Sequence, residues 1–223
     1  AVSVAIAAFP LLTELHSSGK DAEFVKTLQQ SIEQILFFVM PITVLFLIFR
    51  AYIVRLAYGY GQFSCDDTRL TFTALGIFSF ALFSQSLIPL LARAFYARYN
   101  TRIPVIVSLM SLIVNGSLSY LLAPRFGVAG LAIGFATASI FNCLVLLAWL
   151  HHQLANDTNI PHSIIREFNA GVINAVFRVG VSSIPLGLVS YGVLQVVAPL
   201  VDTHTIIGIF IQAGSAGLLG LTA

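Results

Sequence analysis

Charged residues are scarce in this sequence. Asp, Glu, Lys and Arg together make up 9% of its 223 residues. A soluble domain carries about 25% charged residues, which it needs to cover a surface that faces water. The low charge therefore argues against a soluble all-helical domain with a large core. The net charge is only +2, so nothing in the composition suggests a nucleic-acid partner.

Catalytic motifs are absent as well. The sequence has no HExxH pattern, no glycine-rich phosphate loop, and no carboxylate pair or nucleophile–base set that stands out within an apolar run. Cys65 and Cys143 are far apart and lack the spacing of metal ligands, so we expect two ordinary thiols rather than a disulfide framework. We expect a protein that is not an enzyme and that uses no cofactor.

One group of residues would suggest a metal site by composition. His151, His152, Asp157 and His162 lie close together in the sequence. They occupy a polar connector without a fixed helical spacing, so we expect no metal there. Asn156 begins a glycosylation sequon in the same segment, which we place on the cytoplasmic side and therefore discount.

Long apolar runs are what the sequence has in place of charge. Hydrophobic residues make up 58% of the chain, and a membrane-spanning helix needs about 20 of them in succession. We predict an all-α, polytopic transmembrane helical bundle of about seven spans, with the first and last truncated. The predicted spans are residues 1–12, 32–54, 70–91, 105–122, 128–150, 172–200 and 206–223. The chain has no initiator Met and begins and stops in apolar runs, so we expect a fragment.

The basic residues predict the orientation in the membrane. Successive connectors alternate between the two sides, and the side richer in Lys and Arg is normally cytoplasmic. The richer side holds Lys20, Lys26, Arg93, Arg98, Arg102, Arg166 and, at a predicted helix start, Arg178. The other side holds Arg50, Arg55, Arg69 and Arg125. The connectors 13–30, 93–104 and 151–169 are then inside the cell, and the loop 55–69 is outside.

Small residues and prolines within the spans have two interpretations each. Gly130, Gly134 and Ala138 share one helix face and allow a second helix to approach closely. They form either a mobile seam or ordinary tight packing. Pro41 is either a transporter hinge or a static kink. Pro185 has the same two interpretations, and Ser182 and Ser183 before it are candidates to satisfy the freed backbone carbonyl.

Polar residues within the spans are the remaining candidates. Arg50 lies about one turn from Arg55 and its loop, so we expect it to snorkel to the outer interface rather than mark a site at the bilayer centre. Gln85, Asn115 and Asn142 are amides within predicted spans. They line a polar cavity or form hydrogen bonds between helices, and the second reading is the simpler one.

Four stretches resemble the MurJ/MviN lipid II flippase family, part of the multidrug/oligosaccharidyl-lipid/polysaccharide exporter group. They are residues 7–15, 40–68, 93–104 and 127–134, which together cover about the first two-thirds of the chain. The most specific stretch is RAFYARYNTRIP at 93–104. The positions that match the family motifs are Pro10, Pro41, Gly61, Phe63, Phe95, Tyr96, Thr101, Pro104 and Gly130.

The resemblance implies a fold and a role. The family has fourteen transmembrane helices, and this chain would run from the eighth to the fourteenth. Residues 1–150 would belong to the C-terminal six-helix lobe, 151–171 would be a cytoplasmic connector, and 172–223 would be the two last helices, which form a groove for a lipid tail. The implied role is to move lipid II across the bacterial cytoplasmic membrane by alternating access. The implied partners are lipid II, membrane lipid and the N-terminal lobe of the same protein.

Some features depart from the family. Thr13 stands where the family has serine, and Arg50 stands where small or polar residues are common. The arginines of the family's central cavity would precede Ala1, so the substrate-binding residues stay unassigned. Two alternatives remain open: a related exporter of O-antigen lipids, polysaccharide lipids or small cations, and a membrane-embedded enzyme or scaffold.

Overall fold

The computed structural model describes residues 2–58, 65–157 and 160–197. In these ranges the chain forms six helices and no strand. They are α1 (Val2–Ser17), α2 (Asp21–Tyr58), α3 (Cys65–Ala97), α4 (Arg102–Phe126), α5 (Val128–Ala155) and α6 (His162–Val197). Five of them, α2 to α6, are long and apolar enough to cross a membrane, whereas α1 is shorter. The predicted all-α multi-pass bundle is confirmed, and the seventh predicted span, 206–223, lies outside the described residues.

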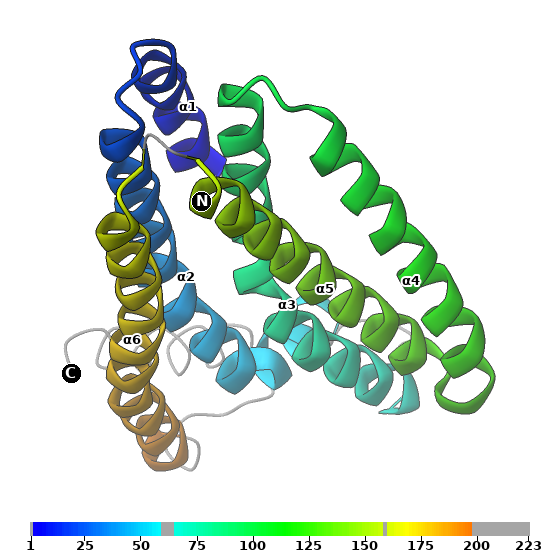
Figure 1. The fold of residues 1–223 in the computed structure, drawn as a ribbon. Coiled ribbons are helices and arrows are strands. Elements are labelled where there is room, and N and C mark those ends of the chain that lie inside the picture. Colours follow the sequence, from blue (N-terminus) through cyan, green and yellow to red (C-terminus); the bar gives the residue numbers. More distant parts are fainter. Residues whose placement is uncertain (1, 59–64, 158–159, 198–223) are drawn as a thin grey trace.

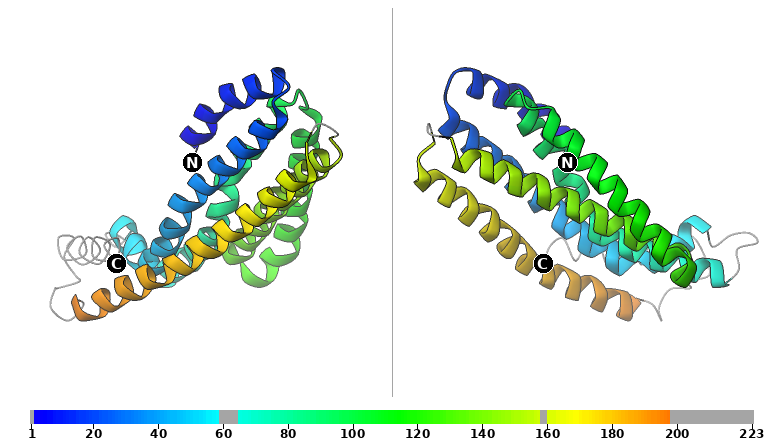
Figure 2. Two further views of the ribbon diagram at one scale, coloured as in Figure 1. Left: turned by 60° about the vertical axis from the view of Figure 1, so that its left-hand side comes forward. Right: turned by 45° about the vertical axis from the view of Figure 1, so that its right-hand side comes forward.

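Helix α3 lies at the centre of the bundle and packs against α1, α2 and α5. Helix α6 runs along α2, and α4 lies on the outside of the bundle beside α5 (Figure 1). Both turned views show α6 running lengthwise along α2 (Figure 2). The α1–α2, α3–α4 and α5–α6 connectors all lie at one end of the bundle, which we call the connector end (Figure 1).

The helices are longer than the sequence predicted, and the connectors are shorter. The predicted connector 13–30 shrinks to residues 18–20, because 13–17 complete α1 and 21–30 begin α2. In the same way, 93–104 shrinks to 98–101, and 151–169 shrinks to 156–161. The predictions were wrong for a physical reason: hydropathy reports where a helix leaves the lipid, whereas backbone hydrogen bonds continue into the polar layer.

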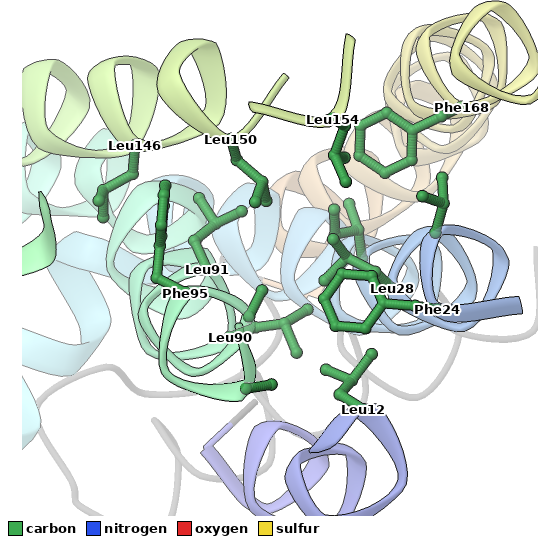
Figure 3. Close-up of a cluster of buried hydrophobic side chains, with 14 of the residues drawn as sticks. Leu12, Phe24, Leu28, Leu90, Leu91, Phe95, Leu146, Leu150, Leu154 and Phe168 are labelled. Atoms are coloured by element: carbon green, nitrogen blue, oxygen red, sulfur yellow. The ribbon is translucent and has the colours of Figure 1, made fainter. Parts of the chain in front are cut away.

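One hydrophobic core joins the helices. Figure 3 shows its centre, where Leu12 of α1, Leu28 of α2, Leu90 of α3, Leu150 of α5 and Phe168 of α6 point toward one another. Each of these side chains is almost completely buried. Full burial of a side chain of this size contributes about 1.5–3 kcal/mol in water. All five helices therefore contribute to a single cluster.

Two helices end at the connector end with the same hydrogen-bond pattern. After α1, Lys20 N–H donates to the Leu15 carbonyl and Gly19 N–H to the His16 carbonyl. After α3, Asn100 N–H donates to the Phe95 carbonyl and Tyr99 N–H to the Tyr96 carbonyl. This is the Schellman pattern, which needs a left-handed residue just after the helix. Gly19 (φ 71°) meets that need without strain, whereas Tyr99 (φ 57°) is a bulky residue in the same conformation.

The prolines at positions 41 and 185 lie within continuous helices. Proline at 185 removes the hydrogen bond that would reach the Val181 carbonyl. The Ser183 hydroxyl donates instead to the Val179 carbonyl, at 2.7 Å. The expectation that Ser183 satisfies the freed carbonyl was therefore wrong, because its side chain reaches back to the residue four before itself. Ser182 is exposed.

Candidate functional site

The most specific family motif lies at the connector end. Phe95 is fully buried in the core, and its carbonyl accepts the capping hydrogen bond from Asn100. Pro104 is buried in the first turn of α4, while Tyr96 and Thr101 are exposed. Thr101 makes no side-chain capping bond; the Asn100 carboxamide oxygen accepts from the Ile103 N–H at 3.4 Å instead. These positions therefore build the α3–α4 turn.

Charged groups join the connectors to one another at the same end. Arg98 Nη2 donates to Asp157 Oδ2 at 2.8 Å, and the two side chains are only 12% and 17% exposed. The Arg98 guanidinium also lies 5.9 Å from the centre of the Phe24 ring. On α1, His16 Nδ1 lies 2.7 Å from the buried Asp21 carboxylate. These contacts fasten the ends of α1, α2, α3 and α5 together.

The predicted glycine seam is a close contact between α4 and α5. Gly130 and Gly134 are buried, and Ser111 of α4 donates a hydrogen bond to the Ala138 carbonyl at 2.9 Å. A Cβ atom at Gly130 would lie 2.6 Å from the Leu122 carbonyl, and one at Gly134 would lie 2.6 Å from the Ser119 hydroxyl. At Gly130 the backbone of α4 thus leaves no room for a Cβ atom, whereas at Gly134 the closest atom belongs to a side chain.

The amides within the spans have different surroundings. Gln85 of α3 donates to the Ser139 hydroxyl of α5 at 2.8 Å, as expected for a hydrogen bond between helices. Asn115 accepts from Ser119 within its own helix, α4. The Asn142 carboxamide oxygen is buried, and within the described part of the chain it has no hydrogen-bond partner. Of the three amides, only Gln85 thus forms a side-chain hydrogen bond to another helix among the described residues.

Arg50 of α2 packs against α3, and its predicted snorkelling to the outer interface stays a prediction. Its guanidinium carbon lies 4.0 Å above the centre of the Phe72 ring of α3. A Cβ atom at Gly76 would lie 2.5 Å from Arg50 Nη1, so Gly76 provides the space for the guanidinium. The aromatic face of Phe72 stabilises the cation.

A polar groove lies between α2 and α6, and we call it the α2–α6 groove. The groove has two parts, both open to the surface. The part nearer the connector end, the outer cavity, has a volume of about 720 Å³. The part further along both helices, the inner cavity, has a volume of about 410 Å³. The charged residues that line it are Glu23, Lys26, Glu33, Glu167 and Arg178. Glu33, Gly171 and Asn174 line both cavities, so the two are continuous.

Gly171 of α6 keeps the groove open. A Cβ atom at this position would collide with the Gln29 carboxamide nitrogen and would lie 3.2 Å from Glu33 Oε1. Gln29 Nε2 donates to Glu33 Oε1 at 2.9 Å, so the absent side chain leaves room for this hydrogen-bonded pair. The groove is thus built into the packing of α2 against α6.

Sequence reasoning missed the α2–α6 groove. The sequence predicted that Arg178 lies at the start of a helix. In the structure α6 begins at His162, so Arg178 lies sixteen residues inside the helix. Glu33 fell within the predicted span 32–54 and was not singled out. A charged residue inside a predicted span was the available signal.

The remaining candidate residues do not form a common site. His151 lies 2.9 Å from the Asn169 carboxamide nitrogen, Asp157 binds Arg98, and the described residues contain no group of three that could hold a metal ion. Pro10 is exposed on α1, Pro41 is half-buried on α2, and Gly130 belongs to the α4–α5 seam. Gly61 and Phe63 lie outside the described residues.

Comparison with known families gives one consistent result. A family model described as "Lipid II flippase MurJ" matches residues 1–205 of this chain. A "Probable lipid II flippase MurJ" of Rhizobium tropici is 32% identical over 152 residues, which cover 68% of this chain and 28% of the relative. A relative of the same name from Bdellovibrio bacteriovorus is 28% identical over 149 residues, covering 67% of this chain and 28% of the relative. The chain thus spans less than a third of the length of these relatives.

A solved structure shares the fold. The structure described as "Lipid II flippase MurJ, inward closed conformation" aligns with a TM-score of 0.70 at 20% sequence identity. The alignment covers 98% of this chain and 41% of that one. The arrangement of α1 to α6 is therefore a known helical membrane fold.

Proposed function

The chain belongs to the lipid II flippase MurJ family, and from this premise we propose that it takes part in moving lipid II, a lipid-linked peptidoglycan precursor, across the bacterial cytoplasmic membrane. The observation that carries the proposal is the family match over residues 1–205. The substrate class follows from the names of the relatives.

The proposed mechanism is alternating access between two lobes. A polar headgroup that entered an apolar layer about 30 Å thick without partners would lose its hydration at a large cost. Two lobes that rock around a shared polar site avoid that cost, because the site opens to one side at a time. The chain would act with an N-terminal lobe that corresponds to the first part of its relatives.

The packing of the described helices supports a lobe that moves as one body. Helices α1, α2, α3, α5 and the first half of α6 share a core, and Arg98–Asp157 and His16–Asp21 fasten the ends of α1, α2, α3 and α5. Helix α4 is held through the seam at Gly130 and Gly134. We assign residues 1–150 to this lobe, 151–171 to a cytoplasmic connector, and 172–223 to two C-terminal helices beside it. The motif positions would then stabilise the lobe rather than bind substrate.

Complementation tests the proposal. The first part of the Rhizobium tropici relative, joined to residues 1–223 of this chain, should restore growth to a bacterium depleted of its lipid II flippase. Residues 1–223 alone should not restore growth, because alternating access needs both lobes. Equal membrane levels of the two proteins, measured by immunoblot, make the comparison valid.

Two results would contradict the proposal. Rescue by residues 1–223 alone would exclude the two-lobe mechanism and indicate a smaller transporter that is complete in itself. Failure of the chimera, although it is inserted in the membrane at normal levels, would remove the assignment to lipid II.

A further inference from the structure

Two charged residues of the α2–α6 groove, Glu33 and Arg178, lie far from the connector-end starts of their helices. Arg178 lies sixteen residues after the start of α6, or about 24 Å along the helix axis. The apolar span of α6, Ser163–Gly192, has Arg178 near its middle. Glu33 lies twelve residues after the start of α2, or about 18 Å along it. Ionised side chains are costly within a bilayer, and those that occur there usually belong to functional sites.

The charges of the groove do not neutralise one another. The ion pairs of the described part of the chain join His16 to Asp21, Lys20 to Glu23 and Arg98 to Asp157. Within that part, neither Lys26 nor Arg178 forms an ion pair with a carboxylate. Glu33 accepts one hydrogen bond from Gln29, and its two oxygens can accept several more. Groups of both signs therefore face the groove with hydrogen-bonding capacity unused.

The edge of the groove is apolar. Phe177 lines the inner cavity and is 72% exposed, and Ile173, one turn earlier on α6, is 66% exposed. Small soluble ions would gain nothing from these two side chains. An amphipathic molecule would form two kinds of favourable contact. Its headgroup would enter the groove, and its acyl chains would lie on Ile173 and Phe177.

The positive and negative charges that line the groove determine which lipid headgroup can bind there. The lining holds three carboxylates, Glu23, Glu33 and Glu167, and two cations, Lys26 and Arg178. A purely anionic headgroup would satisfy the cations but would face the carboxylates. A headgroup with a phosphate and a primary amine satisfies both, because the phosphate accepts from Arg178 and the ammonium donates to Glu33. We propose that the α2–α6 groove is a binding site for an aminophospholipid of the phosphatidylethanolamine type.

Lipid retention tests the site. The chain is placed in nanodiscs of phosphatidylcholine that contain small, equal amounts of phosphatidylethanolamine and phosphatidylglycerol, and retained lipids are counted by native mass spectrometry. Phosphatidylcholine is the background, because its quaternary amine donates no N–H hydrogen bond. We expect phosphatidylethanolamine to be retained selectively. Arg178→Gln and Glu33→Gln should each lower that retention about tenfold, since each removes one charge-assisted contact.

Three further variants separate a specific effect on the groove from a general effect of charge loss or misfolding. Arg125→Gln removes an exposed arginine from the last turn of α4, remote from the groove in sequence and structure, and should leave retention unchanged. Gly171→Leu should abolish retention by filling the groove, while circular dichroism shows whether the helices persist. Arg178→Lys keeps the charge and should retain more lipid than Arg178→Gln.

Three outcomes would overturn the proposal. They are equal retention of the two lipids, retention that survives both Arg178→Gln and Glu33→Gln, and an equal loss in Arg125→Gln. Undecaprenyl pyrophosphate is added as a competitor in a separate arm. Its displacement of phosphatidylethanolamine would assign the groove to the transported substrate instead. This measurement is independent of the complementation test, so the two proposals can fail separately.

Discussion

Arg98 and Asp157 form a hydrogen-bonded ion pair of 2.8 Å although 59 residues separate them in the sequence. The pair joins the connector after α3 to the connector after α5, and its guanidinium lies near the ring of Phe24 on α2. Arg98 belongs to the segment whose three arginines suggested one side of a membrane. It is therefore also a structural residue that fixes the ends of three helices.

Breaking this pair should destabilise the bundle. Arg98→Gln removes the guanidinium charge beside the largely buried Asp157 carboxylate, and loss of one partner from a buried pair costs about 3 kcal/mol. We expect a lower midpoint of thermal unfolding, measured by circular dichroism in nanodiscs. Lys20→Gln is the control, because Lys20 and Glu23 are 60% and 62% exposed at 3.9 Å. That pair should contribute less than about 0.5 kcal/mol, and a similar loss in both variants would contradict a specific role for Arg98.

The seam between α4 and α5 should not tolerate even alanine at one position. Gly130→Ala places a Cβ atom 2.6 Å from backbone atoms of Leu122, so α4 must move away, with an expected cost of about 2 kcal/mol. Gly134→Ala meets mainly the Ser119 hydroxyl, which can rotate, and should cost less. Leucine at either position should be worse. The measurement is thermal unfolding of each variant in nanodiscs.

Gly116 offers a matched control on α4. A Cβ atom there has open space around it, and alanine is the better helix former by up to about 1 kcal/mol in water. Gly116→Ala should therefore be neutral or slightly stabilising. If Gly130→Ala unfolds at the same temperature as Gly116→Ala, the seam is looser than the structure indicates.

Substitutions at the left-handed residues of the two Schellman turns should change the free energy of unfolding in opposite directions. Tyr99→Gly removes a bulky side chain from a left-handed conformation and should raise the free energy of unfolding by about 1 kcal/mol. Gly19→Ala introduces a Cβ atom at the equivalent position after α1 and should lower it by about 1 kcal/mol. Chemical denaturation of both variants checks the signs. A decrease for Tyr99→Gly would mean that its contact with the His16 ring, at 6.2 Å, outweighs the strain.

The orientation can be measured with single cysteines in a Cys65→Ala, Cys143→Ala background. Cysteine at Asn100 or Asn156, both at the connector end, should be protected in intact cells from a thiol reagent that cannot cross the membrane. Cysteine at Arg125, at the opposite end of α4, should react. The prediction rests on the excess of Lys and Arg at the connector end. The reverse labelling pattern would invert the topology.

Within the described residues, the position and order of the spans from α2 to α6 were predictable because each span is a property of about 20 consecutive residues. The seam at Gly130 and Gly134 was predictable for a similar reason, since the spacing of small residues on one helix marks a close approach. The partner helix, α4, happened to be the neighbour in sequence. Local pattern alone therefore sufficed for both features.

The α2–α6 groove was not predictable from local pattern. It depends on the pairing of two helices that are far apart in the sequence, and on Gly171 facing Gln29. The contacts of Arg50 were not predictable for the same reason, because Phe72 and Gly76 belong to another helix. Arg178 was misplaced because the polar start of α6 was read as a connector.

Helices α4 and α5 are separated by a single residue, Gly127, whose N–H donates to the Ala123 carbonyl at 2.8 Å. Their shared seam thus involves only neighbours in the sequence, and the loop that must close is as short as it can be. During biosynthesis this hairpin can assemble as soon as both helices have entered the bilayer. Helix α3, which is inserted earlier, can then pack against the α5 face of this hairpin independently of α6, since α5 makes few contacts with α6.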